Sequence, residues 1–184
     1  MKEKAQMRIG VGDQFPAVEV LTPEGPVDLA RLWSNGPLVI AFHRMWCPFC
    51  QQAAIELTDV APELEQLGGA AIIVYREDLD KVAAACDDRH THALCVSDEH
   101  QSLEDAVGPD QFTPWRYLAF SPRRLFAARR TGAKVGGMGS NVLQGRGTYV
   151  VDRGGHIVYA HQAKTAADIP PIDDVITAAR SAAA

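Results

Sequence analysis

The sequence lacks a hydrophobic run of the length that a membrane-spanning helix needs, which is roughly 20 residues. Residues 1–8 carry charges of both signs and no apolar core, unlike a secretory signal. Neither an internal repeat nor a low-complexity stretch precedes the alanine-rich tail. We therefore expect a cytoplasmic protein with no membrane partner.

Acidic residues are missing between Gln111 and Val151, although the chain as a whole has a net charge of −5. An acidic protein attracts nucleic acid poorly, so we expect no nucleic-acid partner. The interval is predicted to contain a helical insertion at 112–139, which is typical of a solvated surface or of a docking surface for a protein. Its basic residues are Arg116, Arg123, Arg124, Arg129, Arg130, Lys134 and Arg146.

Cysteine is scarce, with four in the chain. Cys47 and Cys50 form one C-x-x-C motif, whereas Cys86 and Cys95 form no second one. A zinc site would need further ligands, and the histidines offer no suitable spacing, so we expect no metal and no organic cofactor. Cys86, in a predicted helix, and Cys95, in a predicted strand, are interpreted as small buried hydrophobes. Either can resolve an oxidised active cysteine only if the fold brings it close.

Strand and helix patterns alternate along the chain, which is typical of an α/β fold with parallel β-α-β units. A composition of 47% hydrophobic and 22% charged residues suits a globular protein, and 184 residues suit one domain, 1–184. Residues 1–10 are expected to be flexible. The predicted strands are 18–21, 38–42, 70–75, 93–96, 148–151 and 156–160, with a brief strand and helical turn over 27–33. The predicted helices are 51–67, 80–87, 102–107 and 172–180.

The C-x-x-C motif lies between a buried strand and a helix, where it is typical of a redox site. Residues 38–42 are continuously apolar, as in a strand buried on both faces. Pro48 suits the first turn of the helix that follows. A thiol at that helix start meets unpaired N–H groups and the positive end of the helix dipole. We therefore expect Cys47 to have a lowered pKa and to be the nucleophile, with Cys50 able to form a disulfide to it.

Residues beside the motif are candidates for tuning or covering the thiol. Arg44 is a cation that would favour the thiolate, or else a charge that extends from a strand end into water. His43 is a candidate base, although a histidine at a strand end is more often packed or hydrogen-bonded. Trp46 is either a shield against water or a core residue. Trp46, Pro48, Phe49 and His43 are the residues expected to contact the substrate.

The strand, Trp-Cys-x-x-Cys and helix together resemble the thioredoxin-fold signature. Residues 12–16, Gly-Asp-Gln-Phe-Pro, and residues 146–155, Arg-Gly-Thr-Tyr-Val-Val-Asp-Arg-Gly-Gly, resemble parts of the peroxiredoxins. These are the peroxiredoxins of the alkyl-hydroperoxide-reductase and thiol-specific-antioxidant (AhpC/TSA) family. The likeness extends over nearly the whole chain. It looks closest to the selenoprotein U-like branch, which carries a C-x-x-C.

The resemblance implies a thioredoxin-like (peroxiredoxin-like) α/β fold: a central mixed sheet, helices on both faces, and the insertion before the last hairpin. It implies antioxidant, thiol-dependent peroxide reduction with Cys47 and Cys50 as a redox-active pair. Arg146 corresponds to the family arginine that stabilises the thiolate and the peroxide oxygens. The family motif P-x-x-x-T-x-x-C fits with either Cys50 or Cys47 as the peroxide-reacting cysteine, and its proline and threonine are absent in both registers.

The partners that the resemblance implies are a peroxide substrate and a thioredoxin- or glutaredoxin-like dithiol donor, with a homodimer as a further candidate. Two alternatives stay open. The first is a thiol-disulfide oxidoreductase acting on protein or small-molecule disulfides, which is disfavoured because Gly147 replaces the thioredoxin cis-proline. The second is a redox-sensing scaffold that binds partners through the basic insertion.

Overall fold

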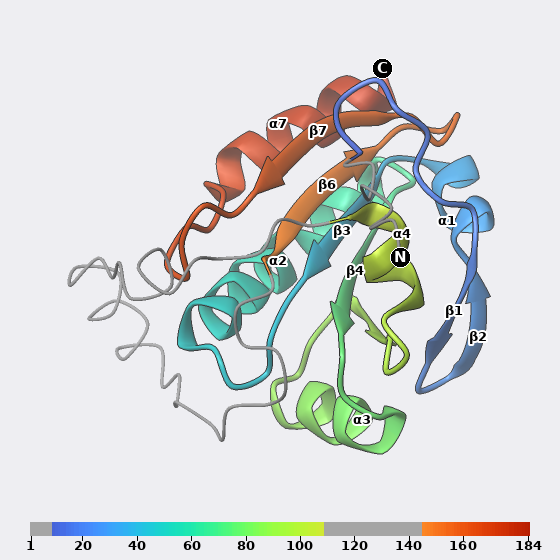
Figure 1. Cartoon of the computed structure of the whole chain (residues 1–184). Helices are drawn as coiled ribbons and strands as arrows, with labels where there is room; N and C mark the ends of the chain where they lie inside the picture. The colour runs from blue at the N-terminus through green and yellow to red at the C-terminus, as the bar shows by residue number, and fades with distance from the viewer. Residues whose placement is uncertain (1–8, 109–144) are drawn as a thin grey trace, which may run out of the picture.

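The central strand, β3 (Leu38–Phe42), is buried along its whole length, as its continuous apolar sequence predicts. It pairs in parallel with β4 (Ala70–Tyr75) and antiparallel with β6 (Gly147–Val151). The computed structural model in which these strands are seen describes residues 9–108 and 145–184 (Figure 1). Because β3 is flanked on both sides, its carboxyl end lies between the ends of neighbouring strands and not at a free edge of the sheet.

The sheet has seven strands in the order β2-β1-β5-β4-β3-β6-β7. β5 (Leu94–Ser97) continues the parallel part beyond β4, and β7 (Ile157–Gln162) pairs antiparallel with β6. The hairpin of β1 (Glu19–Thr22) and β2 (Gly25–Asp28) joins the other edge at β5. The mixed sheet confirms the predicted α/β class and its thioredoxin-like arrangement.

Helices cover both faces of this sheet (Figure 1). One face carries α1 (Leu29–Asn35) and α4 (Ser102–Val107), which bury their apolar side chains against it. The other face carries α2 (Pro48–Gln66), α3 (Leu79–Asp88) and α7 (Ile172–Ala183). Alternate side chains of β3 therefore belong to two separate cores, Leu38, Ile40 and Phe42 to the first and Val39 and Ala41 to the second.

Most predicted element bounds lie close to the observed ones, with α2 beginning at Pro48 and α7 reaching Ala183. Residues 1–10 were expected to be flexible, and residues 1–8 of this range lie outside the described structure. Ile9 packs against the first core, and its N–H donates to the Val107 carbonyl (3.4 Å). The predicted insertion at 112–139 lies outside the described residues.

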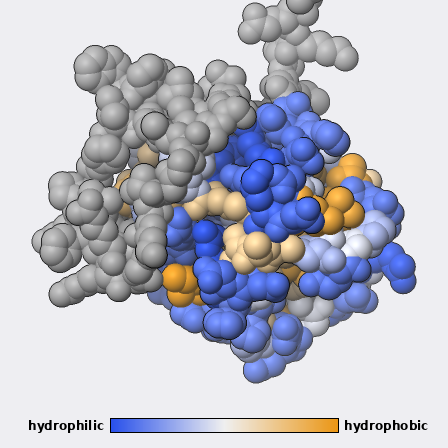
Figure 2. Space-filling model, turned by 90° about the horizontal axis from the view of Figure 1, so that it is seen from below, coloured by the Kyte–Doolittle hydropathy of each residue, from blue (hydrophilic) through white to orange (hydrophobic). Residues whose placement is uncertain are grey.

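Hydrophilic residues cover most of the coloured part of the face shown in Figure 2, where hydrophobic residues lie in small separate patches. Exposed large hydrophobic side chains of the described residues are dispersed along the chain, and they are Val11, Val18, Leu21, Ile55 and Val158. Singly exposed hydrophobic residues are ordinary on protein surfaces. No helix within 9–108 and 145–184 combines the length and apolar character needed to cross a membrane.

Candidate active site

The two cysteines of the C-x-x-C motif lie where the chain passes from β3 into α2. Cys47 is the N-cap of α2 and Pro48 is its first residue, as predicted, which places Cys50 in the first turn. A turn precedes them, in which the Cys47 N–H donates to the Arg44 carbonyl (3.1 Å). Both are free thiols, with Cys47 4% and Cys50 1% exposed. A reactant of a few atoms can reach such a pair more easily than a folded protein can.

Arg146 binds both sulfur atoms with one nitrogen of its guanidinium group. Its Nη1 lies 3.2 Å from Cys47 Sγ and 2.7 Å from Cys50 Sγ. Its Nη2 donates to the Thr165 carbonyl (3.2 Å) and to the Ala166 carbonyl. The residue is 5% exposed and directly precedes β6, the antiparallel neighbour of β3. The structure thus places the sequence-predicted arginine at the thiols, and two carbonyl groups bind the other terminal nitrogen of its guanidinium group.

The two thiols differ in acidity. Burial by itself raises the pKa of Cys50, but the hydrogen bond from Cys47 and the charge of Arg146 outweigh it and hold that pKa well below the ordinary thiol value. The pKa of Cys47 is raised, first by its hydrogen bond to Cys50 and then by burial. The expectation of a lowered pKa at Cys47 is therefore wrong, because a shared proton in a buried pair stays on one sulfur and Arg146 lies closer to the other.

His43 is a buried, neutral imidazole near Cys50 and Arg146. Burial is the main cause that lowers its pKa from 6.5 to about 4. Its backbone N–H donates to the Val74 carbonyl (2.9 Å), and its ring meets the Tyr75 ring edge-on at 6.5 Å. The ring nitrogen Nδ1 is buried without a hydrogen-bond partner in the structure. A neutral imidazole beside Cys50 can accept a proton but supplies no positive charge at neutral pH.

The buried imidazole predicts a loss of stability in acid. Between pH 6.5 and about pH 4 the unfolded chain binds a proton at His43 that the folded protein does not bind. The folded state therefore loses about 3 kcal/mol as the pH falls through this window, and nothing from this group above it. Urea denaturation of wild type and His43→Asn at pH 7 and pH 4 measures the difference. The exposed His100→Asn variant is the control, and an unchanged pH dependence in His43→Asn would contradict the prediction.

A small apolar cluster surrounds the sulfur atoms. Phe49 is buried with Cys47 and Cys50, and Trp46 packs against them while remaining partly exposed. Pro48 is also buried, at the helix start. From the segment after β7, the cluster takes in Ala167 and Ile169, which sequence reasoning missed because no motif marks them. The aromatic residues predicted to cover the thiols, Trp46 and Phe49, are thus joined by Ala167 and Ile169, which lie more than a hundred positions later in the sequence.

Among the hydrogen bonds and ion pairs of the described residues, none joins the Arg44 guanidinium group to a sulfur atom. Its Nη2 pairs with Glu104 Oε1 (2.5 Å) and lies 3.4 Å from the Gly145 carbonyl, while Nη1 donates to the His43 carbonyl (3.1 Å). The side chain is buried and not solvated, which corrects the alternative of a charge extending into water. Glu104 was not a sequence candidate, because an acid on a short helix carries no signal of its partner.

Cys86 and Cys95 form a disulfide, with their Cα atoms 6.7 Å apart. The bond joins α3 to β5, two consecutive elements, so it closes a short loop. The interpretation of these residues as unpaired hydrophobes is therefore wrong. While they are bonded to each other, neither is available to resolve an oxidised Cys47 or Cys50. No group of metal-ligating side chains occurs within the described part of the chain.

A groove of about 350 Å³ lies beside the start of α2. Phe49 and Ile169, which also contact the thiol cluster, contribute to its wall together with Pro170 and Pro171. Gln52 and Glu56 provide polar groups along α2. The groove therefore adjoins the thiol cluster through Phe49 and Ile169, while neither cysteine lines it.

Comparison with solved structures places the fold among the peroxiredoxins. Peroxidoxin BcpB from Mycobacterium tuberculosis superposes with a TM-score of 0.69 at 18% identity, covering 93% of this chain and 96% of that one. Peroxiredoxin Q from Xanthomonas campestris gives 0.68 at 18% identity, over 95% and 99% of the two chains. A peroxiredoxin-like protein from Aquifex aeolicus gives 0.68 at 14% identity, over 95% and 88%. At these identities the likeness concerns the fold.

Comparison of the sequence gives the family. No curated protein matches it. The model of the AhpC/TSA family matches residues 11–160, which include the C-x-x-C motif, the arginine at the thiols and every strand except the end of β7. Since the match extends over most of the 184 residues, the chain belongs to the AhpC/TSA family.

Proposed function

We propose that this protein reduces peroxides with the Cys47–Cys50 pair, and that Cys50 is the cysteine that reacts with the peroxide. The observation that carries the proposal is the position of Arg146, whose Nη1 lies within hydrogen-bonding distance of both buried sulfur atoms. A guanidinium group there favours the thiolate and can also stabilise negative charge on a peroxide oxygen. Membership of a peroxiredoxin family supports this chemistry.

The reaction follows from the protonation states of the two thiols. The Cys50 thiolate attacks the terminal oxygen of the O–O bond and becomes a sulfenic acid, while the other oxygen leaves with the bonding electrons and takes up a proton from solvent to give water or an alcohol. Cys47, which retains its proton, then attacks the sulfenic sulfur through its own sulfur atom. A disulfide forms and water leaves. An external dithiol reduces this disulfide by exchange and is itself oxidised.

The finer assignments rest on the sequence resemblance. We propose a thioredoxin- or glutaredoxin-like protein as the dithiol donor, a cytoplasmic location and a place in the selenoprotein U-like branch. Two copies of the chain are a candidate assembly. For the substrate, we propose an organic hydroperoxide whose apolar part lies in the groove beside Phe49 and Ile169, because that groove adjoins the thiol cluster.

The low solvent exposure of the two thiols disfavours the alternative of a protein-disulfide reductase. A disulfide in a folded partner must bring one of its sulfur atoms into contact with the attacking thiolate. Cys50 is 1% exposed, so this approach would require the start of α2 to open. A peroxide group is far smaller than a folded partner, so it needs a much smaller opening. The scaffold alternative depends on residues 112–139 and lies outside the described structure.

Stopped-flow kinetics tests the proposal. The reduced protein is mixed with hydrogen peroxide or with an organic hydroperoxide, and its rate is compared with its rate on insulin disulfides. We expect fast consumption of peroxide, faster with the organic hydroperoxide, and slow reduction of insulin. Fast insulin reduction with little peroxide consumption would favour the disulfide reductase, and inactivity in both assays would favour the scaffold.

A further inference from the structure

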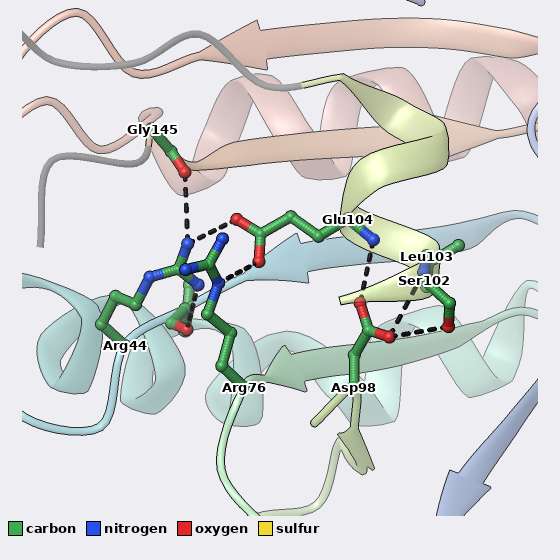
Figure 3. Close-up of polar contacts among 8 residues, drawn as sticks. Arg44, Arg76, Asp98, Ser102, Leu103, Glu104 and Gly145 are labelled. Atoms are coloured by element: carbon green, nitrogen blue, oxygen red, sulfur yellow. Dashed lines mark hydrogen bonds and ion pairs between the residues drawn. The ribbon is translucent and has the colours of Figure 1, made fainter. Parts of the chain in front are cut away.

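The Glu104 carboxylate binds two buried guanidinium groups, one at each of its oxygen atoms (Figure 3). Oε1 accepts from Arg44 Nη2 and Oε2 accepts from Arg76 Nε, each at 2.5 Å. The Glu104 side chain is 1% exposed, and the arginine side chains are 6% and 9% exposed. The three groups come from α4, from the chain after β3 and from the chain after β4, so a single carboxylate joins three elements at the site.

Asp98 fixes the helix from which Glu104 projects. Its Oδ2 accepts the Glu104 N–H (2.9 Å), and its Oδ1 accepts the Leu103 N–H (3.2 Å) and the Ser102 hydroxyl (3.0 Å) (Figure 3). These bonds satisfy the otherwise unpaired groups at the start of α4. Glu104 is therefore a rigid anchor, because both its backbone and its carboxylate are bound.

Arg44 connects this fixed carboxylate to the thiol site, because its side chain binds Glu104 and its backbone binds Cys47. Its carbonyl accepts the Cys47 N–H (3.1 Å), so the Arg44 backbone helps to set the position of the cysteine at the helix start. Its Nη2 also reaches the carbonyl of Gly145, the residue before Arg146 (3.4 Å). The side chain bound by Glu104 thus belongs to a residue that contacts both Cys47 and the segment of the thiol-binding arginine.

The positive charge of Arg44 is paired with the Glu104 carboxylate and not with a sulfur atom. Two guanidinium groups share one carboxylate, and Nη1 and Nη2 of Arg76 are buried without hydrogen-bond partners. Removal of the carboxylate would leave two like charges buried side by side, which would drive Arg44 from its place. If Glu104 acts by positioning Arg44, its neutralisation should raise the pKa of Cys50. If it acts only through its charge, its neutralisation should lower that pKa.

We infer that Glu104 is a positioning residue for the thiol pair, which it keeps in its reactive geometry by binding the Arg44 side chain. The inference deepens the proposed function, because it concerns the reactivity of the same cysteines. It assigns Arg44 a role through its backbone, in place of the direct action of its charge that the sequence indicated.

Glu104→Gln is expected to raise the pKa of Cys50 by a unit or more, which is about a tenfold loss of thiolate at a pH below that pKa. The displaced Arg44 no longer holds the turn before Cys47 next to the Gly145 segment, so the contact between Arg146 and the sulfur atoms is weakened. The peroxide step should slow about 10- to 100-fold, as misplaced reacting groups do. If Glu104 acted only through its charge, its removal would lower the pKa of Cys50, because two cations would then be less neutralised.

Arg44→Lys separates the same alternatives by a second route. It keeps the positive charge but cannot offer the forked geometry that binds Glu104 and the Gly145 carbonyl together. We expect the pKa of Cys50 to rise, as in Glu104→Gln. The matched control is Glu63→Gln, which removes a carboxylate bound to Arg180 (2.6 Å) at an exposed place on α2 and should leave the thiol unchanged.

The measurement is the pH dependence of iodoacetamide alkylation at Cys50, followed by peptide mass spectrometry, with circular dichroism of each variant. An unchanged or lowered pKa of Cys50 in Glu104→Gln, or an unchanged one in Arg44→Lys, would overturn the inference. If one variant does not fold, the other decides. Alkylation requires no peroxide, so a protein that fails to reduce peroxide would refute the proposed function and leave this result readable.

Discussion

Arg146→Met is expected to raise the pKa of the Cys50 thiol by about 1–3 units and to slow the peroxide step about 10²–10³-fold at neutral pH. Its Nη1 contacts Cys50 Sγ at 2.7 Å and Cys47 Sγ at 3.2 Å, within a site from which water is nearly excluded. The substitution removes a charge and two hydrogen bonds, and it leaves a buried thiolate without a cation. Single-turnover kinetics from pH 5 to pH 10 measures both effects.

Two variants make this result specific. Arg146→Lys keeps the charge but loses the second nitrogen that binds the Thr165 and Ala166 carbonyls, so we expect an intermediate pKa and rate. Arg153→Met removes an exposed arginine from the turn that joins β6 and β7 and should match wild type. If Arg146→Met had the wild-type alkylation curve, or Arg153→Met shifted it, the cation at the thiol would have been assigned to the wrong residue.

Cys50→Ser is expected to abolish peroxide reduction, whereas Cys47→Ser should still consume one equivalent. The reason is that the pKa of Cys50 is lowered and that of Cys47 is raised, so the first carries the thiolate and the second the proton. Serine at position 47 can still donate a hydrogen bond to the Cys50 sulfur. It cannot form a disulfide, so the sulfenic acid on Cys50 should persist.

Dimedone labelling and mass spectrometry locate that sulfenic acid. We expect a dimedone adduct at Cys50 in Cys47→Ser and a Cys47–Cys50 disulfide in the oxidised wild type, with Cys86 and Cys95 still bonded to each other. Activity lost in Cys47→Ser and kept in Cys50→Ser would show that the other register of the family motif is right. A bond from either active cysteine to Cys86 or Cys95 would show that the second disulfide takes part in the reaction.

Much of the fold could be predicted because its signals are local. The continuous apolar runs of β3 and β4 predict buried parallel strands, since both of their faces need apolar side chains. Pro48 and the amphipathic pattern after it predict where α2 begins. Gly-rich punctuation predicts the hairpin of β6 and β7, although not its last residues. The C-x-x-C motif at a strand end predicts a redox site for the same reason, because strand, turn and helix start are all written in neighbouring residues.

By itself the sequence therefore determined the α/β class, the element order and the place of the thiol pair. Only the tertiary structure decided which thiol is acidic, where Arg44 points and that Cys86 binds Cys95. These outcomes depend on burial and on charges that are distant in sequence, such as Arg146 and Glu104. A pKa depends on the water and charge within a few ångströms of the atom, and no local pattern of residues records what the fold brings there.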